Sequence, residues 1–108
     1  MQLPGDPRID AIAEALLADP GDDRDLEAWA GELRISERTI TRAFRSSTGL
    51  SFAHWRQALR IHRGLAMLAE GLEVHAVSDQ LGYGHPSTFI AAFRRVMGTT
   101  PGAYADQP

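Results

Sequence analysis

Apolar residues recur every three or four positions along most of the chain, the spacing that gives a helix one apolar face. The longest such stretch runs from Phe52 to Glu70, between the breakers Gly49 and Gly71, and it contains no proline. A helix over this stretch is about 28 Å long at about 1.5 Å per residue. Its predicted buried face carries Trp55, Leu59, His62 and Ala66, with Leu65 and Leu68 alongside. On this pattern His62 is a core histidine.

The sequence repeats itself on either side of this stretch. The first copy starts at Leu26 and the second at Val74. Leu33 matches Leu81 at a separation of 48 residues, whereas the later pairs match at 49: Ile40/Phe89, Phe44/Phe93, Arg45/Arg94, Gly49/Gly98 and Trp55/Tyr104. The copies therefore differ by one residue in a turn. Such a repeat predicts one structural unit used twice, held at a fixed separation by the central helix.

Each copy has the start and stop signals of two short helices. In the first copy, Asp25 is a predicted N-cap for residues 26–33, Ser36 caps residues 37–48, and Gly49 ends that second helix. The predicted buried side chains are Leu26, Trp29, Ala30, Leu33, Ile40, Ala43 and Phe44. Two short helices joined by a tight turn, the second with arginines on its outer face, are typical of a helix-turn-helix.

The second copy follows the same plan. Its first helix ends at a turn over Gly82, Tyr83 and Gly84, and the second restarts at His85-Pro86, with proline at the favoured first position. The predicted core residues are Val74, Val77, Ser78, Leu81, Phe89, Ala92 and Phe93. The Ser78 hydroxyl can bond back to the preceding turn. Gly98 ends the helix, and Pro101 starts a last turn that places Tyr104 where the first copy has Trp55.

Ahead of the first copy, residues 1–8 contain Pro4, Gly5 and Pro7 and are expected to form a loose lead-in or linker. A further helix follows, ended by Asp19-Pro20-Gly21, which we expect to lie as a lid on the first copy. We find no convincing strand, so the prediction is an all-α domain over residues 9–105. Its parts are a first helix-turn-helix subdomain over 9–50, a linker helix over 52–70 and a second subdomain over 72–105.

Two residues conflict with their predicted local structure. Arg34 falls at a turn position that favours glycine, where a positive φ would strain the residue by roughly 1 kcal/mol. Gly64 falls in the middle of the long helix, at a cost of roughly 0.5 to 1 kcal/mol unless another helix crosses tightly there.

Charge is distributed unevenly along a chain whose formal net charge is −3. Residues 1–33 hold nine acids and two bases, whereas residues 34–63 hold one acid and seven arginines. All eleven basic residues are arginine, which suits bidentate recognition of phosphate and guanine, although a GC-rich genome also produces this bias. The acidic N-terminal third should face away from a nucleic acid.

The sequence gives little support for an enzyme or a metal-binding protein. There is no cysteine, and His54, His62, His75 and His85 are scattered. We find no HExxH motif, phosphate-cradling loop or convergent carboxylate pair, so we predict neither a catalytic site nor a metal or cofactor. No apolar run approaches the roughly 18 residues of a membrane span, and the N-terminus lacks a signal-peptide layout, so we expect a cytoplasmic protein.

With these residues in view, the chain resembles the C-terminal DNA-binding domain of the AraC/XylS family of bacterial transcription regulators. The resemblance covers residues 8–105. Its most specific part is LGYGHPSTFIAAFRRVMGTTPGAY, which looks like the family's second helix-turn-helix and its Gly-x-Thr-Pro-x-x-Tyr ending. The resemblance implies about seven helices, with two recognition helices in successive major-groove segments of double-stranded DNA.

The resemblance also implies which residues meet DNA. By position, the base readers are Arg38, Thr41 and Arg42 on the first recognition helix and Ser87, Thr88 and Ala91 on the second. Many family members have arginine where this chain has Ala91. We therefore expect the first helix to dominate specificity, with a preference for guanine, and the second to supply affinity. The expected phosphate contacts are Ser36, Arg45, Arg56, His85, Arg94 and Arg95.

Several alternatives stay open on the sequence alone. Arg38 and Arg42 could instead solvate their helix or pair with Glu37, and His85 could be a helix cap. Arg56, Arg60 and Arg63 could be struts to acidic neighbours, which we favour for Arg60. A helical protein-interaction module that has lost specific DNA binding is the alternative function. The resemblance implies a contact with RNA polymerase and a separate effector or dimerisation domain outside this chain. Monomeric binding to an asymmetric site is the simplest expectation.

Overall fold

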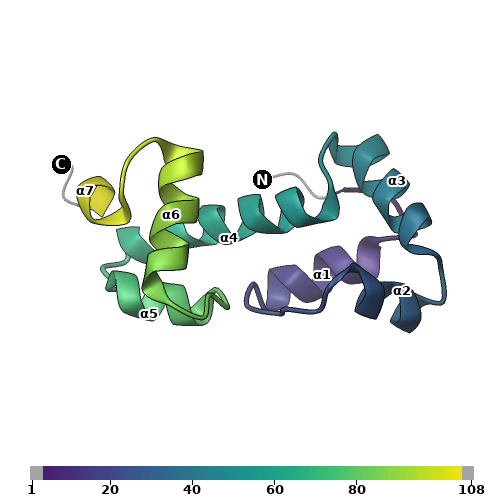
Figure 1. The fold of residues 1–108 in the computed structure, drawn as a ribbon, viewed down its shortest axis with the longest axis horizontal. Coiled ribbons are helices and arrows are strands. Elements are labelled where there is room, and N and C mark those ends of the chain that lie inside the picture. The colour runs from purple at the N-terminus through teal and green to yellow at the C-terminus, as the bar shows by residue number, and fades with distance from the viewer. Residues whose placement is uncertain (1–3, 106–108) are drawn as a thin grey trace.

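The computed structural model describes residues 4–105, and within them it contains seven α-helices and no strand. In chain order these are α1 (Asp10–Ala18), α2 (Leu26–Leu33), α3 (Glu37–Thr48), α4 (Phe52–Ala69), α5 (Val74–Gln80), α6 (Pro86–Met97) and α7 (Pro101–Ala105). The molecule is elongated, 44 × 23 × 20 Å, with α4 running between two groups of helices (Figure 1). The predicted all-α fold is confirmed. No helix in the described range has the length and apolarity to cross a membrane.

The first hydrophobic core is formed by α1, α2, α3 and the N-terminal half of α4. Ile12 and Leu16 of α1 are fully buried in it, which confirms that α1 covers the first helix-turn-helix. Phe44 of α3 lies at its centre, with ring centroids 5.5 Å from Phe52 and 5.4 Å from Trp55. Three helices thus bury their apolar faces against one end of α4.

The second core repeats this arrangement at the other end of α4. Phe93 of α6 is fully buried, and its ring lies 5.8 Å from that of Tyr104 of α7. This pair takes the place that Phe44 and Trp55 have in the first core. The predicted repeat is therefore confirmed in the packing as well as in the sequence.

The apolar face of α4 is not the single stripe that the sequence pattern predicts. Trp55 and Leu59 are buried in the first core, whereas Ile61 and Leu68 are buried in the second. Leu59 and Ile61 point to nearly opposite sides, because two residues span about 200° around a helix. His62 is exposed, so its prediction as a core histidine is wrong, as is the predicted burial of Ala66. A stripe for one core cannot describe a helix that serves two.

The helix ends in both copies match the predicted caps. Asp25 accepts a hydrogen bond from the Ala28 amide at 2.8 Å, and Ser36 Oγ accepts one from the Thr39 amide at 3.0 Å. Gly49 and Gly98 end α3 and α6 in the left-handed conformation. Arg34 ends α2 with φ 57°, which confirms the predicted strained turn.

Ser78 points into the second core as predicted, but its hydroxyl forms no hydrogen bond back to the preceding turn. Its side chain is fully buried in α5, and its Oγ has no hydrogen-bond partner among the residues that the structure describes. The bond back to the preceding turn that this hydroxyl could form is therefore absent. The hydroxyl instead stands among the apolar side chains around Val77 and Leu81 of the second core.

The predicted lead-in, residues 1–8, falls partly outside the described range, because residues 1–3 are not included. Residues 4–8 lead into α1 through a turn at residues 7–9. Pro4 is buried, Arg8 pairs with Asp6, and the Ile9 amide donates to the Asp6 carbonyl at 3.0 Å. Arg8 also holds the pKa of the Asp6 carboxyl down, at about 2.

Candidate nucleic-acid interface

The α3 helix presents an arginine-rich outer face. Ile40, Ala43 and Phe44 fix its orientation by packing into the first core, which turns the opposite face to solvent. Arg38, Arg42 and Arg45 are exposed on that face, and Thr41 between them is half-buried. The structure thus brings together all four residues that the sequence placed here.

The guanidinium groups of Arg38 and Arg42 are not engaged by other residues of the range 4–105. Neither forms an ion pair with Glu37 or with any other residue in that range. An arginine has five N–H donors in a fixed fork, and here the whole fork is available to a ligand. The alternative in which these arginines pair with Glu37 finds no support in the geometry.

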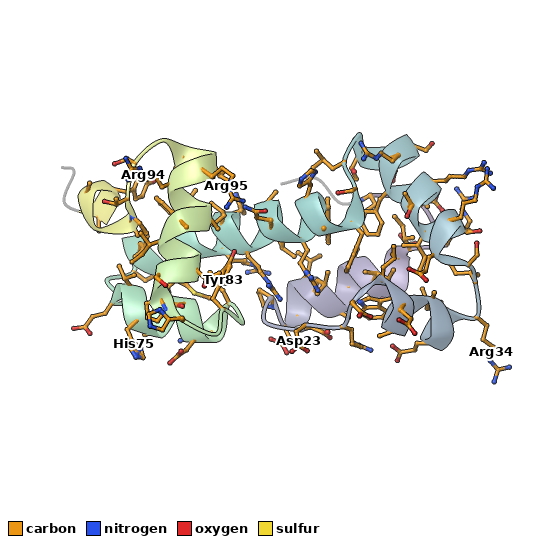
Figure 2. All side chains as sticks on the ribbon, viewed as in Figure 1. Asp23, Arg34, His75, Tyr83, Arg94 and Arg95 are labelled. Atoms are coloured by element: carbon orange, nitrogen blue, oxygen red, sulfur yellow. The ribbon has the colours of Figure 1, made fainter. Side chains whose placement is uncertain are left out.

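The α6 helix is built on the same plan but presents different chemistry. Phe89, Ala92 and Phe93 are buried. The exposed face carries Ser87, Thr88, Ala91, Arg94 and Arg95. Its predicted base-reading positions offer hydroxyls and a methyl group but no bidentate donor, whereas its arginines stand nearer the C-terminal end (Figure 2).

His85 caps α6. Its Nδ1 accepts a hydrogen bond from the Ser87 amide at 3.1 Å and lies 2.8 Å from Ser87 Oγ. A ring nitrogen that accepts from an amide carries its lone pair there, so the ring proton belongs on Nε2. This confirms the cap reading of His85 and leaves Nε2–H as a donor for a second partner.

The three arginines of α4 bind backbone carbonyls, not the acidic side chains that the strut interpretation predicted. Arg56 Nη1 donates to the Arg24 carbonyl at 2.9 Å, and Arg63 Nη2 donates to the Leu17 carbonyl at 3.0 Å. Arg60 donates from Nε to the Pro20 carbonyl at 2.8 Å and from Nη2 to the Asp22 carbonyl at 3.0 Å. Together they fasten the end of α1 and the α1–α2 loop to α4.

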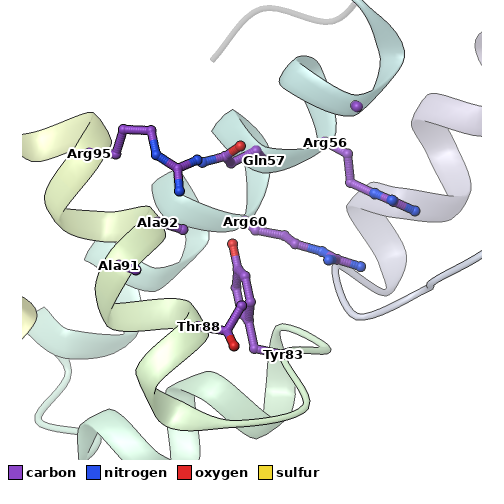
Figure 3. Close-up of a pocket in the computed structure, with 9 residues that line it drawn as sticks. Arg56, Gln57, Arg60, Tyr83, Thr88, Ala91, Ala92 and Arg95 are labelled. Atoms are coloured by element: carbon purple, nitrogen blue, oxygen red, sulfur yellow. The ribbon is translucent and has the colours of Figure 1, made fainter.

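A cleft of about 330 Å³ opens between α4 and α6 (Figure 3). Gln57 and Arg95 extend toward each other across it, and Arg60, Tyr83 and Thr88 line it further down. Burial raises the pKa of the Tyr83 hydroxyl. Gln57 was not among the predicted site residues. Its only sequence signal was a polar position on the long helix, and the contact with the α6 face requires the folded arrangement.

Comparison of sequences shows relatives along most of the chain. A family model described as a helix-turn-helix domain matches residues 29–107. The transcriptional regulator RipA of Corynebacterium glutamicum is 35% identical over 102 residues, which are 94% of this chain and 31% of RipA. NimR of Escherichia coli is 38% identical over 98 residues, which are 91% of this chain and 36% of NimR. The chain thus spans about a third of the length of these curated relatives.

Comparison of folds finds a relative of the same size. The DNA-binding domain of the transcriptional factor AdpA, whose crystal structure contains a target DNA, is 30% identical to this chain, with a TM-score of 0.81. The match covers 94% of this chain and 91% of the AdpA domain. The chain belongs to the AraC/XylS family of helix-turn-helix transcription regulators, as a DNA-binding domain of that family.

Proposed function

We propose that this chain binds double-stranded DNA in a sequence-specific manner as part of a bacterial transcription regulator. The observation that carries the proposal is the duplicated helix-turn-helix, in which α3 and α6 occupy equivalent positions at the two ends of α4. An α4 of 18 residues is about 27 Å long, near the roughly 34 Å repeat of the duplex. The two helices can therefore enter successive major-groove segments. The AdpA domain, with a target DNA in its crystal structure, supports the same role here.

The two helices contribute unequally in this proposal. Arg38 and Arg42 can each bind a guanine edge in bidentate fashion, at about 1 to 3 kcal/mol of discrimination per contact, and Thr41 stands between them. Ser87, Thr88 and Ala91 offer single hydrogen bonds or a methyl contact. The first helix therefore sets most of the specificity, and the second adds affinity and a weaker preference.

Phosphate contacts position the domain and carry no sequence information. Arg45, Arg94 and Arg95 are exposed beside the two reading faces and are suited to this role. Ser36 and His85 lie at the N-termini of α3 and α6, where backbone amides favour an anion. The Nε2–H of His85 adds a donor there. Gln57 joins this set through its position opposite Arg95.

Arg56 is less suited to a phosphate contact than the sequence analysis predicted. Its Nη1 holds the Arg24 carbonyl, which leaves only part of the guanidinium for DNA. We therefore assign Arg56 a structural role first and a phosphate contact second.

The proposal has consequences for partners and location. The curated relatives are about three times the length of this chain, so an effector or dimerisation domain would act from outside it. A contact with RNA polymerase would suit a regulator, as would a place beside the chromosome in the cytoplasm. The alternative, a protein-interaction module that has lost specific DNA binding, predicts that the domain enriches no motif from random duplex DNA, because any remaining salt-dependent affinity is sequence-independent.

Selection of bound sites from random duplex DNA tests the proposal. The wild-type domain should enrich a G-containing block, beside a weaker block about one helical turn away. Arg38→Ala/Arg42→Ala should lose the G-containing block. Arg38→Lys/Arg42→Lys is the matched control, because it keeps the charge and removes the bidentate fork, and it should lose selectivity while it retains most non-specific affinity. No enrichment by the wild type, or the same motif from all three proteins, would reject the assigned readers.

A further inference from the structure

The two helix-turn-helix units touch at a point well away from the axis of α4. Gly21 of the α1–α2 loop and Gly82 of the α5–α6 turn meet backbone to backbone. A β carbon on Gly82 would lie 2.7 Å from the Gly21 carbonyl oxygen, and one on Gly21 would lie 2.9 Å from the Gln80 carbonyl oxygen. Each distance is shorter than a β carbon tolerates, so this approach requires glycine on both sides.

Arg60 holds this contact in place from α4. Its two hydrogen bonds reach the Pro20 and Asp22 carbonyls, which flank Gly21 on either side. Its guanidinium carbon also lies 5.6 Å from the ring centroid of Tyr83, the residue after Gly82. Burial lowers the pKa of Arg60, but an arginine remains charged in a protein, and its planar fork fits two carbonyls at once.

The contact between Gly21 and Gly82 gives the two units a second connection, in addition to α4. Two units joined by one helix alone can differ in their relative bend and twist, because long helices are not straight rods but curve gently along their length. A second contact off the helix axis removes that freedom. The α1–α2 loop belongs to the first unit, and the α5–α6 turn leads directly into α6, so the contact fixes the start of α6 relative to the first core.

We propose that Gly21, Gly82 and Arg60 form a spacing junction that sets the separation and relative rotation of α3 and α6. The proposal rests on the DNA-binding function proposed above and assigns it a further determinant, the number of base pairs between the two contacted segments. One base pair changes the separation by about 3.4 Å and the rotation by about 35°. Two backbones in contact at this junction oppose a change of that size in the arrangement of the two units.

The distance between α3 and α6 in the DNA-free protein tests whether the junction fixes their relative position. The chain has no cysteine, so spin labels can be attached at Ser46→Cys on α3 and Val96→Cys on α6, both exposed positions. Pulsed electron resonance should give a narrow distance distribution. Gly21→Ala should shift or broaden this distance distribution, and the substitution adds no backbone strain because Gly21 has no positive φ. Arg60→Gln should have the same effect and provides a second test if Gly21→Ala folds poorly. Gly31→Ala, with open space around it, is the control and should leave the distance distribution unchanged.

Hydroxyl-radical footprinting on a selected site tests whether the junction sets the spacing between the two contacted DNA segments. The wild type and Gly31→Ala should protect two backbone patches at one fixed separation, whereas Gly21→Ala and Arg60→Gln should show a displaced or blurred second patch. Unchanged distances and footprints in both folded junction variants would overturn the proposal while DNA binding stands. A wild type that protects no DNA would remove the proposed function and the spacing role with it, and the spin-label distances would still report whether the junction is rigid.

Discussion

Gly64 of α4 lies directly against the ring of Phe89 of α6. A β carbon on the glycine would stand 3.3 Å from Phe89 Cε1 and 3.2 Å from Leu81 Cδ1. Both neighbours are fully buried, so neither has open space into which to move. This contact explains a glycine in the middle of the longest helix, because it lets α6 and the end of α5 approach α4 closely.

Gly64→Ala should therefore lower the free energy of unfolding. The better helix propensity of alanine is worth roughly 0.5 to 1 kcal/mol, whereas overpacking of a buried contact costs about 1 to 3 kcal/mol. We expect a net loss of about 1 kcal/mol, measured by urea denaturation. Gly31→Ala, on an exposed face of α2, provides the comparison and should gain stability. A gain in both variants would show that Phe89 and Leu81 can shift at little cost.

Arg34→Gly should raise the free energy of unfolding by about 1 kcal/mol, because Arg34 has φ 57° and only glycine adopts this conformation without strain. The side chain is exposed and projects away from the body (Figure 2), so its loss removes no packing. Arg34→Ala removes the same charge but keeps the β carbon, and it should gain little. Equal effects of the two substitutions in thermal denaturation would assign the change to charge and not to backbone strain.

The sequence predicted what depends on neighbours along the chain. The caps at Asp25 and Ser36, the left-handed Arg34 and the pairing of Tyr104 with the second core each follow from a short stretch or from the repeat. Positions governed by two cores at once were not predictable in the same way. His62 sits on the exposed side of α4 because the buried face changes sides after Leu59.

The candidate site also combines features that the sequence predicts with features that only the fold determines. The outer face of α3 follows from the burial of Ile40 and Phe44, so its arginines could be assigned from spacing. The partners of the α4 arginines could not, because Arg60 binds carbonyls 38 and 40 residues earlier in the chain. A hydrogen bond to a backbone carbonyl cannot be inferred from the sequence, because every residue has one. The contact of Gly21 with Gly82 likewise cannot be inferred before the loops are placed.

Ser78→Ala should stabilise the protein. A buried hydroxyl without a partner retains its desolvation cost, about 1 to 3 kcal/mol, and alanine removes the polar atom while it keeps the β carbon. We expect a gain of about 1 kcal/mol in urea denaturation. Ser46→Ala, at an exposed position in α3, measures the difference in helix propensity and should gain less. A loss of stability in Ser78→Ala would indicate that the hydroxyl has a partner, such as a buried water.

Stability should fall in acid through the Asp22–Arg24 pair. Hydrogen bonds from Arg24 hold the pKa of the Asp22 carboxyl below its ordinary value of 3.8. A carboxyl whose pKa is lowered by folding adds stability above its unfolded pKa, and that contribution is lost as the pH falls through the folded pKa. Asp22→Asn should therefore be less stable than the wild type at pH 6, with a difference that shrinks in urea titrations below about pH 4.

Asp23→Asn is the control for this pH dependence. It removes a carboxylate from the same loop, but Asp23 is exposed and takes part in none of the ion pairs of residues 4–105. It should reproduce the effect of a lost negative charge without the loss of an ion pair. An equal pH dependence in both variants would mean that net charge, and not the pair with Arg24, controls acid stability.

Arg45→Ala should weaken DNA binding without changing its sequence preference. Arg45 is exposed at the edge of the α3 face, where it can reach a phosphate, and removal of one phosphate-binding arginine lowers the slope of log affinity against log salt by about 1. Arg38→Ala should instead change the selected bases. Binding titrations at several salt concentrations, on a selected site and on a site with its guanines replaced, separate the two effects. If Arg45→Ala loses affinity only for the selected site, Arg45 reads bases and its assignment to the phosphate backbone is wrong.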